Sequence, residues 1–140
     1  MTVHDLRRDA ATHILESGAE WADTPKEVAQ KSEVIFTSLP GPIDVESVVL
    51  GPDGISEGIT TGQIYLDLST NSPTVTRRLH QELADRGVAM LDVPVSGGVV
   101  GAEEGTLSML VGGDQALYNQ MLPLLLQLGD KPFYCGPSGA

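Results

Sequence analysis

Residues 92–113 read DVPVSGGVVGAEEGTLSMLVGG, and their types suit a binding loop better than a linker. Paired glycines such as Gly97 and Gly98 free the backbone to take positive φ and to approach another molecule closely. Successive N–H groups in a turn such as Ser96-Gly97-Gly98 can converge into a concave site for an anion, either a carboxylate or a phosphate. The alternative is that the glycines only make tight turns between strands, and the motif by itself leaves both interpretations open.

Two apolar runs flank this loop. The first covers residues 88–95 and the second residues 107–111, and the second ends in another glycine pair. Short apolar runs bounded by turn residues suit buried strands more than helices. The sequence therefore predicts that Ser96-Gly97-Gly98 follows directly on a buried strand.

The bulk composition limits what the loop could bind. At 140 residues the chain is about one domain, and 41% apolar with 19% charged residues is ordinary for a soluble globular protein. The net charge of −11 argues against nucleic acid as a partner, because few side chains could neutralise a phosphate backbone. Only Lys131 is basic after Arg86, so an anion at the loop would need backbone N–H groups or a lysine from elsewhere.

No apolar run has membrane-spanning length and no signal-peptide pattern opens the chain, so we expect no membrane partner. A single cysteine, Cys135, excludes an internal disulfide framework and favours a reducing compartment, which predicts a cytoplasmic protein. We expect Cys135 to be a small apolar residue in a strand and not a nucleophile, because no motif pairs it with a histidine. No residue is assigned to a metal.

Hydrophobic periodicity and turn residues predict the elements that position the loop. Thr24-Pro25 and Ser72-Pro73 combine a capping residue with a proline suited to the first helical position, and Asp114 is a third predicted cap. The predicted strands are 2–5, 34–39, 63–68, 88–95, 107–111 and 131–135, and the predicted helices are 8–16, 24–29, 43–50, 73–83 and 114–128.

The 92–113 segment resembles the substrate-binding signature of the β-hydroxyacid dehydrogenases, the family of 3-hydroxyisobutyrate dehydrogenase, tartronate semialdehyde reductase and 6-phosphogluconate dehydrogenase. Members of the first two types read D-A-P-V-S-G-G, then G-A, G-T/N-L and M-V-G-G. Here Val93 replaces the usual Ala and Leu110 lies close to the expected Met. The resemblance covers essentially all 140 residues and implies that Ser96, Gly97 and Gly98 hold the substrate carboxylate.

The resemblance also implies which residues contact the cofactor. Leu39 and Pro40, after a predicted strand, match a Leu-Pro pair that packs against it, and Asp44 stands where the family often has Asn. Thr70 matches the Thr of a D-S-S-T segment that reaches the nicotinamide half. Without the resemblance, the residues around Pro40 could be a proline-rich turn that binds nothing.

Asp5 closes the first predicted strand. By itself it could be a solvated turn or helix-start residue, whereas the resemblance makes it the acidic residue that accepts hydrogen bonds from the adenosine ribose. Asp5 is followed by Leu6, which favours NAD over NADP. Arg7 and Arg8 leave NADP open.

The resemblance implies a Rossmann-like, doubly wound, mostly parallel α/β sheet. No G-x-G-x-x-G is present, so we expect the first strand, the glycine loop and the first helix to be missing upstream of Met1. The family's catalytic lysine, in a K-x-x-N pattern, is expected beyond Ala140, together with the C-terminal helical domain. Residues 1–140 would then be a partial dinucleotide-binding domain without a catalytic residue of its own.

These inferences predict a fragment of an oxidoreductase that transfers a hydride between NAD(P) and a small 3-hydroxy acid such as 3-hydroxyisobutyrate. One alternative is another short hydroxyacid or semialdehyde reductase, for example of tartronate semialdehyde. A second is a non-catalytic dinucleotide-binding module. The expected ligand is a small carboxylate, and family analogy predicts a homo-oligomer for the full-length protein.

Overall fold

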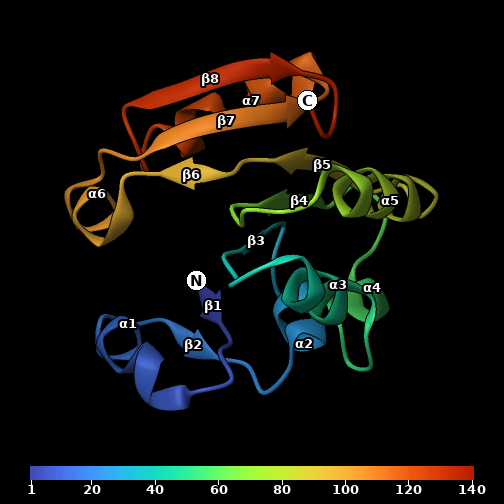
Figure 1. The fold of residues 1–140 in the computed structure, drawn as a ribbon. Coiled ribbons are helices and arrows are strands. Elements are labelled where there is room, and N and C mark those ends of the chain that lie inside the picture. The colour runs from blue at the N-terminus through green and yellow to red at the C-terminus, as the bar shows by residue number, and fades with distance from the viewer.

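A computed structural model describes residues 1–140, the whole sequence. Its central sheet has six strands in the order β3-β4-β5-β7-β6, and β8 pairs with β7 (Figure 1). Strands β3, β4 and β5 are parallel, β8 is parallel to β7, and β7 runs antiparallel to β5 and β6. The prediction of a mostly parallel α/β sheet is therefore confirmed. The strands are β3 (Val34–Thr37), β4 (Ile64–Asp67), β5 (Ala89–Asp92), β6 (Val95–Ser96), β7 (Ser108–Gly113) and β8 (Lys131–Gly136).

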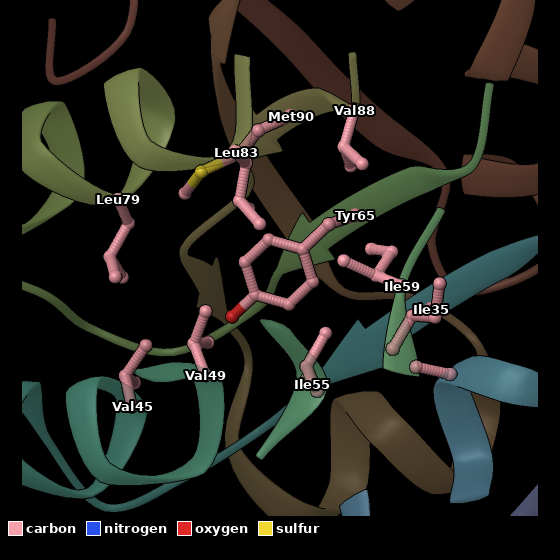
Figure 2. Close-up of a cluster of buried hydrophobic side chains, with 11 residues drawn as sticks. Ile35, Val45, Val49, Ile55, Ile59, Tyr65, Leu79, Leu83, Val88 and Met90 are labelled. Carbon is pink, nitrogen blue, oxygen red and sulfur yellow. The ribbon is translucent and has the colours of Figure 1, made fainter. Parts of the chain in front are cut away.

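Helices cover both faces of this sheet. Successive residues of a strand point to opposite faces, so neighbouring residues of one strand pack against different helices. Tyr65 and Leu66 of β4 are both fully buried, and they belong to different apolar clusters. Side chains from β3, β5 and four helices surround the Tyr65 ring (Figure 2). Leu66 instead packs with residues of β5, β7 and one helix. The four helices of the first cluster are α2 (Pro25–Gln30), α3 (Pro42–Leu50), α4 (Ile55–Gly58) and α5 (Pro73–Ala84), and the helix of the second is α7 (Gln115–Leu125).

The first part of the chain forms a separate two-stranded parallel sheet (Figure 1, blue). It contains β1 (Thr2–Val3), the 3₁₀-helix η1 (Arg8–Ala11), α1 (Thr12–Glu16) and β2 (Glu20–Trp21). Strand β1 pairs only with β2, and β3 pairs only with β4. Each of these two parallel strands therefore keeps one edge without a partner.

Two of the three predicted helix caps are confirmed. The hydroxyl of Thr24 accepts a hydrogen bond of 3.2 Å from the N–H of Glu27, and Asp114 caps α7 through its carboxylate. The predicted side-chain cap at Ser72 is wrong, since its hydroxyl bonds to no helix N–H. The side-chain Oδ1 of Asn71 instead accepts a hydrogen bond from the N–H of Ser72.

The structure divides two of the predicted elements. The 8–16 helix begins as η1 and continues as α1. The 88–95 run is two strands, because Pro94 has no N–H to continue a ladder and the chain changes its pairing there. Helix α6 (Gly98–Glu104) occupies a stretch with no predicted element, and β2 and α4 were also not predicted. No helix combines the length and apolar character needed to cross a membrane.

Candidate functional site

Strands β3, β4 and β5 end at the same level. Thr37 of β3 pairs in register with Asp67 of β4, and Asp67 pairs with Asp92 of β5. The loops that follow the three strands therefore leave the sheet at one edge. In open α/β sheets ligands bind outside the carboxyl ends of the strands, so this edge is the candidate binding site.

A buried polar network lies directly under two of these loops. The Asp67 carboxylate accepts hydrogen bonds from the Thr37 hydroxyl (2.9 Å), the Ser69 N–H (3.1 Å) and the side-chain amide of Asn71 (3.1 Å). The Ser69 hydroxyl in turn accepts from the N–H of Leu39 at 2.9 Å. The loop after β3 and the loop after β4 are thus connected through the side chain of Ser69.

Tyr65 extends the network into the core. Its hydroxyl lies 2.6 Å from the Thr37 hydroxyl oxygen. Burial raises the pKa of Tyr65 and the Asp67 carboxylate raises it further, while the hydrogen bond between Tyr65 and Thr37 acts in the opposite direction. Tyr65 therefore keeps its proton. Because the single hydroxyl proton of Thr37 goes to Asp67, Tyr65 is the donor to Thr37.

The predicted cofactor residues lie in or next to these loops. Leu39 is half-buried, and Pro40 and Thr70 are exposed at the carboxyl edge. The hydrogen bond between Leu39 and Ser69 brings the first loop against the second. Asp44 is also exposed and lies in the first turn of α3, which follows the first loop.

Asp5 is exposed just after β1, in the separate two-stranded unit. One of its carboxylate oxygens accepts a hydrogen bond of 2.8 Å from the N–H of Arg7, and the other has no partner within the chain. The guanidinium of Arg7 pairs with Asp9 at 2.9 Å on the surface. Asp5 therefore retains a free acceptor oxygen, as a hydrogen bond from a ribose hydroxyl would require.

The glycine loop has the backbone that the sequence predicted. Gly97 has a φ of 139° and Gly98 a φ of 62°, and both residues are exposed. Helix α6 begins at Gly98 without a side-chain cap. The N–H groups of residues 97–100 consequently have no acceptor within the chain. These amide hydrogens are free for an anion, although the role of the loop as a carboxylate site stays a prediction.

Strand pairing places this loop beyond the carboxyl edge. Asp92 pairs with Gly112 of β7, whereas Ser96 pairs with Ser108 of the same strand. At the usual rise of an antiparallel strand, Ser96 lies about 13 Å past the end of β5. Both β5 and β6 run antiparallel to β7, so the chain continues in one direction, and α6 projects beyond it (Figure 1).

The structure brings one basic residue near the loop, which the sequence analysis did not foresee. Ser108 pairs with Ser96 on one side and with Lys131 of β8 on the other. Two strand spacings separate the backbones of Ser96 and Lys131 by about 10 Å. Lys131 is exposed and forms no ion pair. Only the parallel pairing of β7 with β8 could reveal this, because the two residues are far apart in sequence.

A small pocket of about 70 Å³ lies beside the network, between the loop after β4 and the last turn of the chain. Its lining includes Ser69, Asn71, Asp92, Pro94 and Gly139. Asp67 and Asp92 were not among the predicted site residues. The only signal in the sequence is that each carboxylate interrupts an otherwise apolar run. No group of three or more His, Cys, Asp or Glu side chains is placed to hold a metal ion.

The fold and these loops define a Rossmann-like dinucleotide-binding domain. Residues 1–136 match the family described as the NAD binding domain of 6-phosphogluconate dehydrogenase, and the chain belongs to this family, within the β-hydroxyacid dehydrogenases. The NAD-dependent L-serine dehydrogenase of Pseudomonas aeruginosa is 38% identical over 100% of this chain and 47% of its own length. The 3-hydroxyisobutyrate dehydrogenase of the same organism is 36% identical over 100% of this chain and 47% of its own length.

Among solved structures, Psf3 in complex with NADP+ and 2-OPP superposes with a TM-score of 0.92 at 32% identity, covering 99% of this chain and 49% of Psf3. The chain spans about half the length of the curated relatives it matches. Their named activities differ, so the match establishes the NAD binding domain but not one substrate or reaction.

Proposed function

We propose that this chain is the cofactor-binding part of an NAD(P)-dependent dehydrogenase that oxidises a small 3-hydroxy acid, with 3-hydroxyisobutyrate as the first candidate. The observation that carries the proposal is the set of unbonded N–H groups at residues 97–100, which lies past the carboxyl edge of the sheet. A cluster of free backbone donors suits a carboxylate. Tartronate semialdehyde reduction is the alternative within the same chemistry, because the two family types share the signature.

Each residue has a defined part in this proposal. The hydroxyl of Ser96 and the N–H groups of Gly97 and Gly98 hold the substrate carboxylate, and Lys131 adds positive charge nearby. A bound nicotinamide supplies the hydride acceptor. Fixing the carboxylate restricts the orientation of the substrate, which lowers the entropic part of the barrier.

The cofactor lies, in the proposal, across the loops at the carboxyl edge. Asp5 accepts hydrogen bonds from the ribose through its free oxygen. Leu39, Pro40 and Thr70 line the cleft for the nicotinamide half, and Asp44 contacts the cofactor from the start of α3. Asp5 with Leu6 favours NAD, while Arg7, which pairs with Asp9 on the surface, and Arg8 leave NADP open.

We further propose that the whole protein has one more parallel strand between β1 and β3. The support is that β1 pairs only with β2 and β3 only with β4, so each of these parallel strands has one edge without a partner. Unpaired backbone N–H and C=O groups at a sheet edge are a template for another strand. A glycine loop after that strand would hold the pyrophosphate, a task for which we assign no residue among these 140.

The acid/base group for the reacting oxygen is assigned to a lysine outside this chain. Lys26 pairs with Glu57 at 3.7 Å, and neither Lys31 nor Lys131 lies in a K-x-x-N pattern. Reading the DNA on both sides of the coding sequence tests this assignment. A continuous frame with G-L-G-x-M-G before and K-x-x-N after is the expected result, whereas stop codons on both sides would favour a non-catalytic dinucleotide-binding module.

Steady-state kinetics on the protein encoded by the whole frame test the site. We expect Ser96→Ala to lower kcat/KM for 3-hydroxyisobutyrate by about tenfold or more, since a hydrogen bond to a charged group contributes about 1.5–3 kcal/mol. The KM for NAD should stay unchanged. Ser108→Ala, the strand partner of Ser96, is the matched control. Equal effects of both variants would contradict the carboxylate site, and NAD reduction by the 140-residue chain alone would contradict the need for an external lysine.

A further inference from the structure

The Asp67 carboxylate is 1% exposed and has no basic side chain within ion-pair distance. A buried charge without a partner costs several kcal/mol unless hydrogen bonds replace its lost hydration. Asp67 has three such donors, and they come from three different places: strand β3, the backbone after β4 and the Asn71 side chain. An apolar residue would fill this position at a lower cost in solvation.

From this arrangement we infer that Asp67 is a positioning residue that fixes the loop 38–41 relative to the loop 68–72 through its hydrogen bonds. The inference rests on the proposed function, because these loops carry the candidate cofactor residues Leu39, Pro40 and Thr70. Asp67 touches none of them. It acts through its hydrogen bonds with Thr37, Ser69 and Asn71, which fix the two loops relative to each other.

The first connection runs from the core to the carboxylate. Tyr65 donates to Thr37, and Thr37 donates to Asp67, so both hydroxyl protons point the same way along the network. This direction leaves Thr37 no proton for another acceptor. The end of β3, from which the first loop departs, is therefore tied to the end of β4.

The second connection passes through Ser69, which is 4% exposed. Its N–H donates to one Asp67 oxygen, and its hydroxyl accepts from the N–H of Leu39. A shift of Ser69 away from Asp67 would release Leu39 as well. The backbone position of the Leu39-Pro40 pair thus depends on a carboxylate 28 residues later.

The third connection offers a test by exchange of groups. In Asp67→Asn, the oxygen of the new amide can still accept from Thr37 and Ser69, but its NH₂ then faces the NH₂ of Asn71. In the double variant Asp67→Asn with Asn71→Asp, residue 67 donates and residue 71 accepts, so the pairing is restored with opposite direction. Residue 71 keeps an oxygen for the N–H of Ser72.

The experiment measures three quantities on the protein encoded by the whole frame: the dissociation constant for NAD and NADP, the free energy of unfolding, and the hydrogen-exchange rate of the Leu39 amide. We expect Asp67→Asn to weaken cofactor binding by about tenfold and to speed Leu39 exchange, as the loss of a buried hydrogen bond to a charged group implies. The double variant should recover most of both losses. Asp85→Asn, which removes an exposed carboxylate of the same charge, should change neither.

Two results would overturn the inference. One is an Asp67→Asn protein that is less stable but has unchanged cofactor affinity and Leu39 exchange, which would leave Asp67 a purely structural role. The other is a double variant that recovers stability without recovering Leu39 protection. If Asp67→Asn does not fold, Ser69→Ala provides the second test, because it removes the acceptor of the Leu39 N–H while Asp67 keeps its three donors.

The failure of the proposed function would look different. A wild-type protein that binds neither NAD nor NADP would contradict the proposed function, and the exchange rate of the Leu39 amide would still decide the role of Asp67. A wild-type protein that binds NAD, with an Asp67→Asn variant that binds it equally well and protects Leu39 equally well, would contradict only the positioning role.

Discussion

The hydroxyl of Ser138 donates a hydrogen bond of 2.9 Å to the carboxylate of Asp92, a residue 46 positions earlier. The N–H of Gly139 donates to the same carboxylate at 3.2 Å, and Arg77 of α5 donates to the Gly139 carbonyl at 3.0 Å. The last turn of the chain is therefore fastened to the end of β5, where the 92–113 segment begins.

Removing this attachment should destabilise the protein. We expect Ser138→Ala to lower the free energy of unfolding by about 1–2 kcal/mol and Asp92→Ala by about 3 kcal/mol, because the second change leaves the buried N–H of Gly139 without an acceptor. Urea unfolding measures both. Ser47→Ala, at an exposed position of α3, is the control and should change little. Equal small effects for all three variants would show that the attachment contributes nothing.

The raised pKa of Tyr65 predicts how stability depends on alkaline pH. In the unfolded chain a tyrosine loses its proton near pH 10, whereas the folded protein keeps the proton on Tyr65 to higher pH. Above about pH 10 the unfolded state binds fewer protons, so the free energy of unfolding falls by about 1.4 kcal/mol per pH unit from this group. Below pH 10 Tyr65 adds no pH dependence.

Tyr65→Phe checks this prediction. The variant loses the hydrogen bond to Thr37 and should be less stable at neutral pH by about 1 kcal/mol. Its stability should then fall less steeply than that of the wild type between pH 10 and 11. Parallel curves for the two proteins over this range would show that Tyr65 titrates normally when folded.

Gly129 should not tolerate a side chain. A Cβ at this position would lie 1.9 Å from the carbonyl oxygen of Leu107, a backbone atom that cannot turn away. We expect Gly129→Ala to cost about 3 kcal/mol through overpacking. Gly41→Ala is the matched control, because no atom lies within 4 Å of its Cβ position. Thermal unfolding of the two variants measures the difference in stability. Similar melting temperatures would contradict the close packing of Gly129 against the backbone of Leu107.

Lys131 should affect carboxylate binding weakly and only through its charge. At about 10 Å in water, a unit charge contributes about 0.4 kcal/mol, which is about a twofold change in affinity. Lys131→Gln should therefore raise the KM of a carboxylate substrate about twofold at low ionic strength and by less at high salt. Lys31→Gln, at the end of α2, is the control. A salt-independent loss would point to a direct contact or to a structural defect.

Local chemistry was sufficient to predict most elements. Thr24 and Asp114 cap helices as expected, and Gly97 and Gly98 take the positive φ that glycine makes accessible. These outcomes depend on neighbouring residues, so the sequence contains the information. Ser72 shows the limit, since its N–H bonds to the side chain of Asn71 and its hydroxyl caps no helix N–H.

The alternation of side chains along strands also let the sequence determine the kind of sheet, although not its pairing. Ile64, Leu66 and Leu68 alternate along the predicted 63–68 strand and indicate one apolar face, yet Tyr65 on the opposite face is as buried as Leu66 because helices cover both sides. The division of the 88–95 run at Pro94 and the pairing of Ser96 with Ser108 depend on β7, which pairs with both β5 and β6.

The chain by itself thus determined the family, the type of sheet, the glycine loop and the candidate residues at the strand ends. Only the tertiary structure shows that Asp67 hydrogen-bonds to residues at the start of both loops and that Ser138 donates a hydrogen bond to Asp92. It also shows that Lys131 and Ser96 pair with the same residue, Ser108. The reason is physical: each of these relationships joins residues that strand pairing brings together, and register between distant strands is set by packing of the whole core.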